Sequence, residues 1–203
     1  MPFKIGLKQF VDFSLHPHWS LSTLFKGIPE PKNFRYGSEN RFDRNASRAG
    51  ANWEFLDALR EKWKGNLIIK GIMDTDDASR VQNAGVDAIW VSNHGGRQLD
   101  SSPPALSALP KIRNTVGPNL PIIFDSGARN GEDVVKALAL GANFVMLGRP
   151  IMMALAASSK KGLNDYLSLL KDEIGVVMAQ LGINDLEKIS GDVLYDGISK
   201  NIR

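Results

Sequence analysis

Four short segments of polar residues and glycine each follow an apolar run, and they contain most of the residues able to do chemistry. They are Lys70-Gly71, Ser92-Asn93-His94-Gly95-Gly96-Arg97, Asp125-Ser126-Gly127-Ala128-Arg129 and Gly148-Arg149-Pro150. A histidine such as His94 can take up a proton near neutral pH, and an arginine such as Arg97 can hold a carboxylate through two hydrogen bonds. A lone histidine or arginine is more often structural. This pair, in a loop that also contains glycine, predicts a base beside a carboxylate site.

The third and fourth segments predict a phosphate site. Glycines let backbone N–H groups approach a phosphate, and Arg129 and Arg149 add planar, permanent positive charges. For one loop alone, the simpler interpretation is that glycine serves a turn. Two adjacent loops with an arginine in each favour phosphate. The role of Lys70 is left undecided at this point, because a solvated lysine at the end of a strand is as good an interpretation as a functional one.

From residue 52 onward, the stretches between these segments alternate between strand and helix patterns. Short, wholly apolar runs predict strands covered on both faces at 67–69, 88–91, 121–124 and 144–147. Capping residues and apolar spacing predict helices that begin near Asn52, Thr75, Pro103 and Glu132, and two more at 151–157 and 163–181. Successive units of this kind form a parallel sheet, so the four polar segments are expected on one face of it.

Composition excludes several classes of protein and site. The 203 residues have a formal net charge of +3, and the charges are scattered, which argues against a nucleic-acid surface. There is no cysteine, so disulfides, thiolate metal sites and a cysteine nucleophile are excluded. No metal-ligand spacing is visible, no run is long enough to span a membrane, and the first residues lack a signal-peptide pattern. We therefore expect a cytoplasmic protein, either soluble or in peripheral contact with the inner face of the cell membrane.

Residues 1–51 have a different character from the remainder of the chain. Aromatic and aliphatic residues crowd around Pro17, and residues 34–48 are polar without a clear period. We interpret this region as a long connection with an apolar patch, followed by a flexible stretch. The patch either lies buried against the folded domain or contacts a membrane surface, and the nearby lysines favour the membrane. His16 and His18, which flank Pro17, are assigned no chemistry.

Taken together, the four motifs resemble those of the FMN-dependent 2-hydroxy acid dehydrogenases and oxidases. The run from Ser92 to Asp100 is similar to the active-site motif of that family without a departure, and the other three motifs occur in the family's order. The resemblance extends over essentially all of the chain. It implies an α/β fold in which residues 52–203 form the C-terminal half of a (β/α)₈ barrel, with four βα units followed by C-terminal helices.

The resemblance also implies roles for individual residues. His94 would be the general base that accepts a proton from the substrate, and Arg97 would bind the substrate carboxylate. Lys70 would lie against the flavin N1 and C2 carbonyl, and Ser92 would touch the flavin ring. The ribityl chain and phosphate of FMN would be held by Asp125, Ser126, Gly127, Ala128, Arg129, Gly148 and Arg149.

The chain resembles only half of the family's barrel. The first four strands have no counterpart here, nor do the aspartate that orients the base, the aromatic substrate contacts and a second arginine. We therefore expect the chain to require an N-terminal half-barrel or self-association. The alternatives are a catalytically silent half-barrel module and an FMN-binding isomerase, although the His94–Arg97 loop argues against the isomerase.

The substrate implied is a small L-2-hydroxy carboxylate, with L-lactate first and mandelate or glycolate as alternatives. The apolar connection resembles that of membrane-associated bacterial lactate and mandelate dehydrogenases more than that of glycolate oxidases. A quinone or a cytochrome as electron acceptor would be consistent with a location at the membrane, and oxygen is a further alternative for the electron acceptor.

Overall fold

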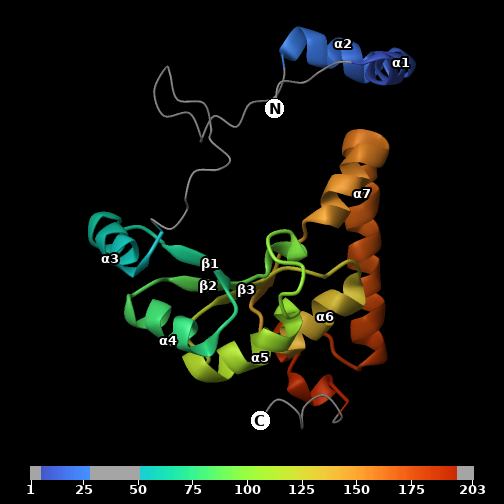
Figure 1. The fold of residues 1–203 in the computed structure, drawn as a ribbon. Helices are drawn as coiled ribbons and strands as arrows, with labels where there is room; N and C mark the ends of the chain where they lie inside the picture. The colour runs from blue at the N-terminus through green and yellow to red at the C-terminus, as the bar shows by residue number, and fades with distance from the viewer. Residues whose placement is uncertain (1–5, 28–50, 196–203) are drawn as a thin grey trace. The chain divides into compact units, whose positions relative to one another are not determined.

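A computed structural model of the chain describes residues 6–27 and 51–195, which are coloured in Figure 1. The chain divides into two units, Met1–Gly50 and Ala51–Arg203. Each unit is described by itself. The stretch at 34–48 that was predicted to be flexible lies outside the described residues.

The second unit is an α/β fold built on a parallel four-stranded sheet, as predicted. The strands pair in the order β1-β2-β3-β4, the same as their order in the chain. Their bounds are β1 Ile68–Ile72, β2 Ala88–Val91, β3 Ile122–Phe124 and β4 Phe144–Val145. One helix precedes the sheet and three lie between its strands: α3 Trp53–Lys62, α4 Thr75–Asn83, α5 Ala105–Val116 and α6 Gly131–Ala139.

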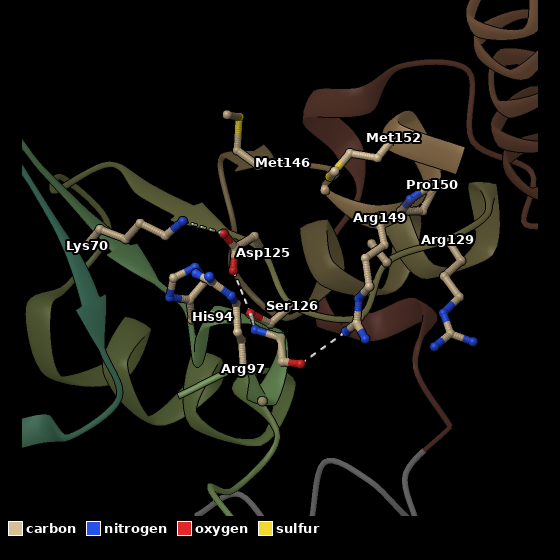
Figure 2. A pocket seen from close by; sticks show the side chains of 15 residues that line it. Lys70, His94, Arg97, Asp125, Ser126, Arg129, Met146, Arg149, Pro150 and Met152 are labelled. Carbon is tan, nitrogen blue, oxygen red and sulfur yellow. Dashed lines mark hydrogen bonds and ion pairs between the residues drawn. The ribbon is translucent and has the colours of Figure 1, made fainter. Parts of the chain in front are cut away.

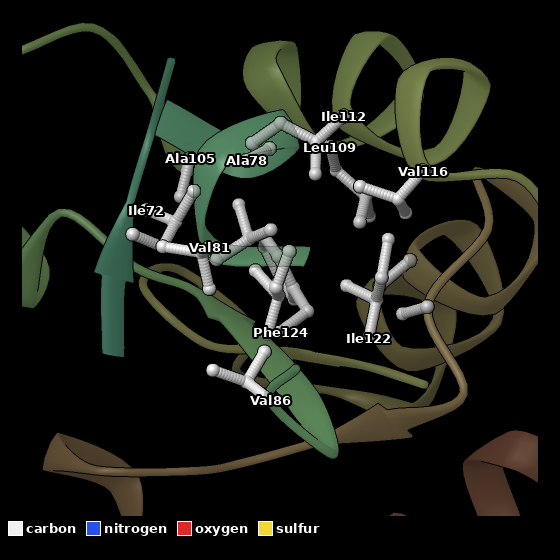
Figure 3. Close-up of a cluster of buried hydrophobic side chains, with 14 of the residues drawn as sticks. Ile72, Ala78, Val81, Val86, Ala105, Leu109, Ile112, Val116, Ile122 and Phe124 are labelled. Carbon is white, nitrogen blue, oxygen red and sulfur yellow. The ribbon is translucent and has the colours of Figure 1, made fainter. Parts of the chain in front are cut away.

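The hydrophobic core lies between the sheet and the helices that connect its strands (Figure 3). Ile89 and Phe124 from the two central strands are buried against Val81 of α4 and Leu109 and Ile112 of α5. Burying a side chain of this size contributes about 1.5–3 kcal/mol. The core therefore holds strands β2 and β3 in place, and the loops that follow them carry most of the candidate site.

Helix starts follow the expected capping chemistry with one correction. Asn52 caps α3, its side chain accepting a hydrogen bond from the N–H of Phe55 at 3.0 Å. The cap of α4 is Asp74 and not Thr75, because the Asp74 carboxylate accepts from the N–H groups of the first turn. Asn130 caps α6 in the same way.

Three strands differ from their predicted extents, and β3 differs only in that it begins at Ile122 and not at residue 121. Strand β1 runs to Ile72 and includes Lys70, which the sequence placed just after the strand. Its register with β2 shifts between Lys70 and Ile72, at Gly71, whose φ is +98°. The prediction that this strand is covered on both faces was wrong, because it lies at the sheet edge and Ile68 is 44% exposed. Strand β4 is shorter than predicted.

The two helices predicted after residue 150 form the two arms of α7 (Arg149–Gln180). Ser158 and Ser159 have non-helical backbone angles, and the chain reverses there, as the orange helix of Figure 1 shows. A Cβ on Gly162 would lie 2.2 Å from the carbonyl oxygen of Ala154, so glycine is required where the arms meet. Two short 3₁₀ helices follow, η3 (Leu186–Lys188) and η4 (Gly191–Val193).

The first unit contains helices where the sequence predicted only a connection. These are α1 (Leu7–Leu15) and α2 (Pro17–Lys26). Pro17 does not interrupt a helix but starts one, because its fixed φ suits the first helical position and its missing N–H is not needed there. The rings of Phe13 and Trp19 lie 5.5 Å apart across the junction.

The apolar side chains of α1 and α2 are largely exposed, and neither helix has a buried residue. Leu7, Leu24 and Phe25 are more than three-quarters exposed. Across residues 6–27 and 51–195, no helix combines the length and the apolar character that crossing a membrane requires. The helices therefore present an apolar surface without spanning a bilayer.

Candidate functional site

A cavity of about 580 Å³ lies at the carboxyl ends of the strands (Figure 2). All but one of the predicted site residues line it. The lining consists of Lys70, His94, Gly95, Gly96, Arg97, Asp125, Ser126, Gly127, Ala128, Arg129, Met146, Gly148, Arg149, Pro150 and Met152. In folds with a parallel sheet, functional sites lie at the face where the strands end. Loops that are up to 82 positions apart in the sequence therefore come together around this cavity, from Lys70 to Met152.

The segment 92–97, called the base loop below, has a conformation that few residues adopt. His94, Gly95 and Gly96 form the 3₁₀ turn η2 with φ values of +57°, +65° and +75°. Positive φ is easy for glycine but uncommon for histidine, so the surrounding contacts must hold His94 in it. The base loop thereby presents the His94 and Arg97 side chains to the cavity.

Two serines supply those contacts. Ser92 Oγ accepts a hydrogen bond from the N–H of His94 at 3.1 Å, and Ser126 Oγ accepts one from the N–H of Gly95 at 3.0 Å. Ser92 is the predicted site residue that does not line the cavity. It is 2% exposed and lies beneath the loop. Its observed contacts are with the base loop, with Ser126 and with the Asp125 carboxylate.

Lys70 and Asp125 form an ion pair on the floor of the cavity, with 3.2 Å between Nζ and Oδ2. The Lys70 ammonium also lies 4.2 Å from the ring centroid of Trp90. Ser126 donates its hydroxyl proton to Asp125 at 2.5 Å. Burial would raise the pKa of Asp125, but hydrogen bonds from Ser126, Ser92 and Lys70, with the Lys70 charge, outweigh burial and lower it. Asp125 is therefore an anion at neutral pH.

Arg149 joins the two sides of the cavity. Its Nη2 donates to the carbonyl oxygen of Gly95 at 3.1 Å. A Cβ on Gly95 would lie 2.9 Å from that nitrogen, so glycine is needed both for the positive φ and for this contact. The sequence predicted Arg149 as a phosphate ligand and gave no indication that it also supports the base loop.

The segments 125–131 and 148–150, called the phosphate loops below after the ligand predicted for them, form the other side of the cavity. The Arg129 N–H donates to Asp133 at 2.9 Å, and the Arg129 carbonyl accepts from the hydroxyl of Tyr166 at 2.9 Å. The N–H of Gly131 donates to Glu173 at 2.8 Å. Sequence reasoning missed Tyr166 and Glu173. Their spacing of about two helical turns places them on one face of a helix, but nothing in the sequence says what that face contacts.

The charge of the cavity is positive. Lys70, Arg97, Arg129 and Arg149 line it together with one carboxylate, Asp125. Across the described residues, no group of three or more His, Cys, Asp or Glu side chains is placed to hold a metal ion. The lining therefore fits an anionic organic ligand with a phosphate or carboxylate group.

Comparison with known proteins identifies the family. Residues 1–196 match the family described as FMN-dependent dehydrogenase. The chain belongs to this family. The resemblance read from the four motifs is confirmed, and so is the fold class, since the structural relatives are (β/α)₈ barrels of which this chain covers about half.

Individual relatives include enzymes named for two substrates. The chain is 38% identical to the (S)-mandelate dehydrogenase of Pseudomonas putida over 97% of its own length and 51% of that protein's. It is also 38% identical to an L-lactate dehydrogenase of Acinetobacter baumannii, over 97% and 54% of the two chains. A crystal structure of a monotopic membrane protein, (S)-mandelate dehydrogenase, superposes with a TM-score of 0.85 at 37% identity, covering 96% of this chain and 53% of the other. The chain thus spans about half the length of these relatives.

The cavity is compatible with the cofactor that names the family. A Cβ on Gly127 or Gly148 would meet nothing within 4 Å, so both phosphate loops leave open space at the cavity. Arg129 and Arg149 border that space, and Lys70 lies on the floor away from them (Figure 2). A phosphate near the arginines and an electron-accepting ring near Lys70 would match this distribution of charge.

Proposed function

We propose that this chain carries the FMN-binding half and the base loop of an enzyme that oxidises an L-2-hydroxy acid to the 2-oxo acid. The observation that supports it most directly is that one cavity is lined by His94, Arg97 and the three further cations Lys70, Arg129 and Arg149. An acid–base group, a carboxylate clamp and a phosphate site are the three parts that such a reaction needs from the protein.

In this proposal His94 accepts a proton from the substrate, while Arg97 holds the carboxylate so that the substrate hydroxyl faces His94. Bound FMN would take up the two electrons and the second hydrogen that leave the substrate. Lys70 would stabilise negative charge on the flavin ring, and the phosphate loops would hold the ribityl phosphate. The predicted contact of Ser92 with the ring remains a prediction, and its buried position beneath His94 suits support of the base loop as well.

The test of cofactor binding is to purify the chain and record its absorbance and flavin fluorescence after incubation with FMN. We expect yellow protein with quenched fluorescence, and weaker binding when Arg129 and Arg149 are both changed to Gln. A chain that folds but binds no FMN, even when co-expressed with the N-terminal half of a relative, would favour the alternative of a silent half-barrel module.

We propose L-lactate as the substrate, with mandelate second. Relatives named for the two acids are equally similar to this chain, at 38% identity over 97% of its length, so the two acids are compared directly. Anaerobic flavin reduction by each acid distinguishes them. Faster reduction by (S)-mandelate or glycolate than by L-lactate would contradict the first choice.

Turnover should require four more strands, supplied by an N-terminal half-barrel or by a second copy of the chain. Phe144 and Met146, at the β4 edge, are 59% and 37% exposed, as expected of surfaces that another element covers. Co-expression with the N-terminal half of a relative should increase lactate-dependent dye reduction. Full activity of the chain as a monomer would contradict this. Assays with a quinone, a cytochrome and oxygen then identify the electron acceptor.

A peripheral membrane contact is proposed for α1 and α2. The exposed apolar side chains of both helices support it, as does the similarity to a relative described as monotopic. In liposome flotation, changing Phe13 and Trp19 to Ser should reduce binding, whereas changing the exposed Phe55 of α3 to Ser should not. Equal flotation of all three proteins would contradict the proposal.

A further inference from the structure

The phosphate loop at 125–131 is held by a part of the chain far from it in sequence. Tyr166 and Glu173 lie on the second arm of α7, 37 and 42 residues beyond the loop residues that they contact. Leu170, the buried residue of α7, lies between them on the same face of the helix. One stripe of α7 therefore both packs against the domain and contacts the loop.

The contacts act on the main chain of the loop. Tyr166 donates to the carbonyl oxygen of Arg129 while Asp133 accepts from the N–H of the same residue, so both backbone polar groups of Arg129 are engaged. Glu173 accepts from the N–H of Gly131. A loop residue with both polar groups bonded cannot turn without breaking a hydrogen bond.

The packing at Gly131 leaves no room for the loop to move towards α7. A Cβ on Gly131 would lie 2.4 Å from the backbone nitrogen of Ile174 and 2.6 Å from the carbonyl carbon of Glu173. The helix backbone and the loop backbone are thus in direct contact. Within residues 51–195, no carboxylate lies within ion-pairing distance of the Arg129 guanidinium, which borders the cavity.

We propose that Tyr166 and Glu173 are positioning residues of the phosphate site, which hold the backbone of Arg129 and Gly131 so that the Arg129 guanidinium stays directed at a flavin phosphate. This inference rests on the proposed FMN function. Burial, with the nearby charges of Glu173 and Asp133, raises the pKa of Tyr166. The hydroxyl therefore remains a donor throughout the neutral range.

The test compares FMN with riboflavin, which has the same ring without the phosphate. In the full chain, Tyr166→Phe should lower FMN affinity about 2- to 10-fold, the loss expected for one hydrogen bond, and leave riboflavin affinity within about twofold. The matched control is Tyr195→Phe, because Tyr195 is 85% exposed. Glu173→Ala should act like Tyr166→Phe, whereas Glu173→Gln keeps an acceptor oxygen and should largely restore FMN affinity.

The outcomes separate this inference from the proposed function. A parent chain that binds FMN no more tightly than riboflavin has no phosphate site, and both proposals then fail. If the parent prefers FMN and the Tyr166 and Glu173 variants keep that preference, only the positioning role is wrong. Equal weakening of both ligands would indicate general destabilisation and would also overturn it.

A second measurement does not depend on flavin binding. Hydrogen exchange at the Gly131 amide should accelerate in Glu173→Ala and remain at the parental rate in Asp172→Asn, since Asp172 is an exposed neighbour on the same helix. Equal exchange rates in the two variants would show that the Glu173 contact does not hold the loop.

Discussion

The two sides of the cavity are held in place by different means. The base loop depends on Ser92 and Ser126, which bind the amides of His94 and Gly95, and on Arg149, which donates to the Gly95 carbonyl. The phosphate loop at 125–131 depends on α7, which contacts it through Tyr166 and Glu173. A change of the His94 side chain should therefore alter proton transfer and leave cofactor binding intact. A change at the contact with α7 should alter cofactor binding and stability.

The largest effect is expected at the base. In the active enzyme, His94→Gln should slow flavin reduction by about 10²–10⁴-fold, because the base is lost. FMN content should stay at the parental level, since the phosphate loops are unchanged. Anaerobic stopped-flow absorbance measures the reduction. His18→Gln, at an exposed position on α2, is the control. Reduction at a near-normal rate would show that His94 is not the base.

A glycine pair tests the dependence of the phosphate loop on α7. Gly131→Ala should lower the free energy of unfolding by about 1–3 kcal/mol or more, because its Cβ would overlap the backbone of α7. Gly175→Ala, on α7 itself and with nothing within 4 Å of a Cβ, should raise it by about 0.5–1 kcal/mol. Urea unfolding measures both. If both variants changed the free energy of unfolding in the same direction, the close contact at Gly131 would be contradicted.

The carboxylate clamp should show a smaller and more selective effect. Arg97→Lys keeps the charge but loses the planar pair of donors, so KM for the hydroxy acid should rise about tenfold. FMN content should not change, because Arg97 belongs to the base loop. Steady-state kinetics with lactate measures KM, and Lys111→Arg on the exposed side of α5 is the control. Unchanged KM and kcat would exclude Arg97 as the clamp.

The smallest effect concerns the ion pair on the cavity floor. The pKa of Asp125 is lowered in the folded protein, so its contribution to stability is present above the ordinary aspartate pKa of about 3.9. That contribution is lost as the pH falls through the lower folded-state value. Asp125→Asn should thus lower Tm at pH 7, and the difference from the parent should shrink in acid. If the difference in Tm between Asp125→Asn and the parent grew as the pH fell, the lowered pKa of Asp125 would be contradicted.

The sequence by itself determined the elements and the chemistry of the site. Apolar runs predicted the strands because a strand buried in a parallel sheet needs apolar residues on both faces, and β2 was predicted to the residue. The same motifs indicated the family, and parallel topology placed His94, Arg129 and Arg149 at one edge of the sheet. The sequence predicted only a connection where α1 and α2 lie, because a proline such as Pro17 can either end a helix or start one, and the local pattern does not distinguish the two.

Only the tertiary structure decided which distant residues meet. Arg149 contacts Gly95 across 54 residues, and Tyr166 and Glu173 reach the phosphate loop from the second arm of α7. The contacts of Tyr166 and Glu173 depend on where the chain reverses at Ser158 and Ser159 and on how closely two backbones approach at Gly131. Local sequence patterns report the period and capping of one element at a time. They carry no information about the partner against which that element packs.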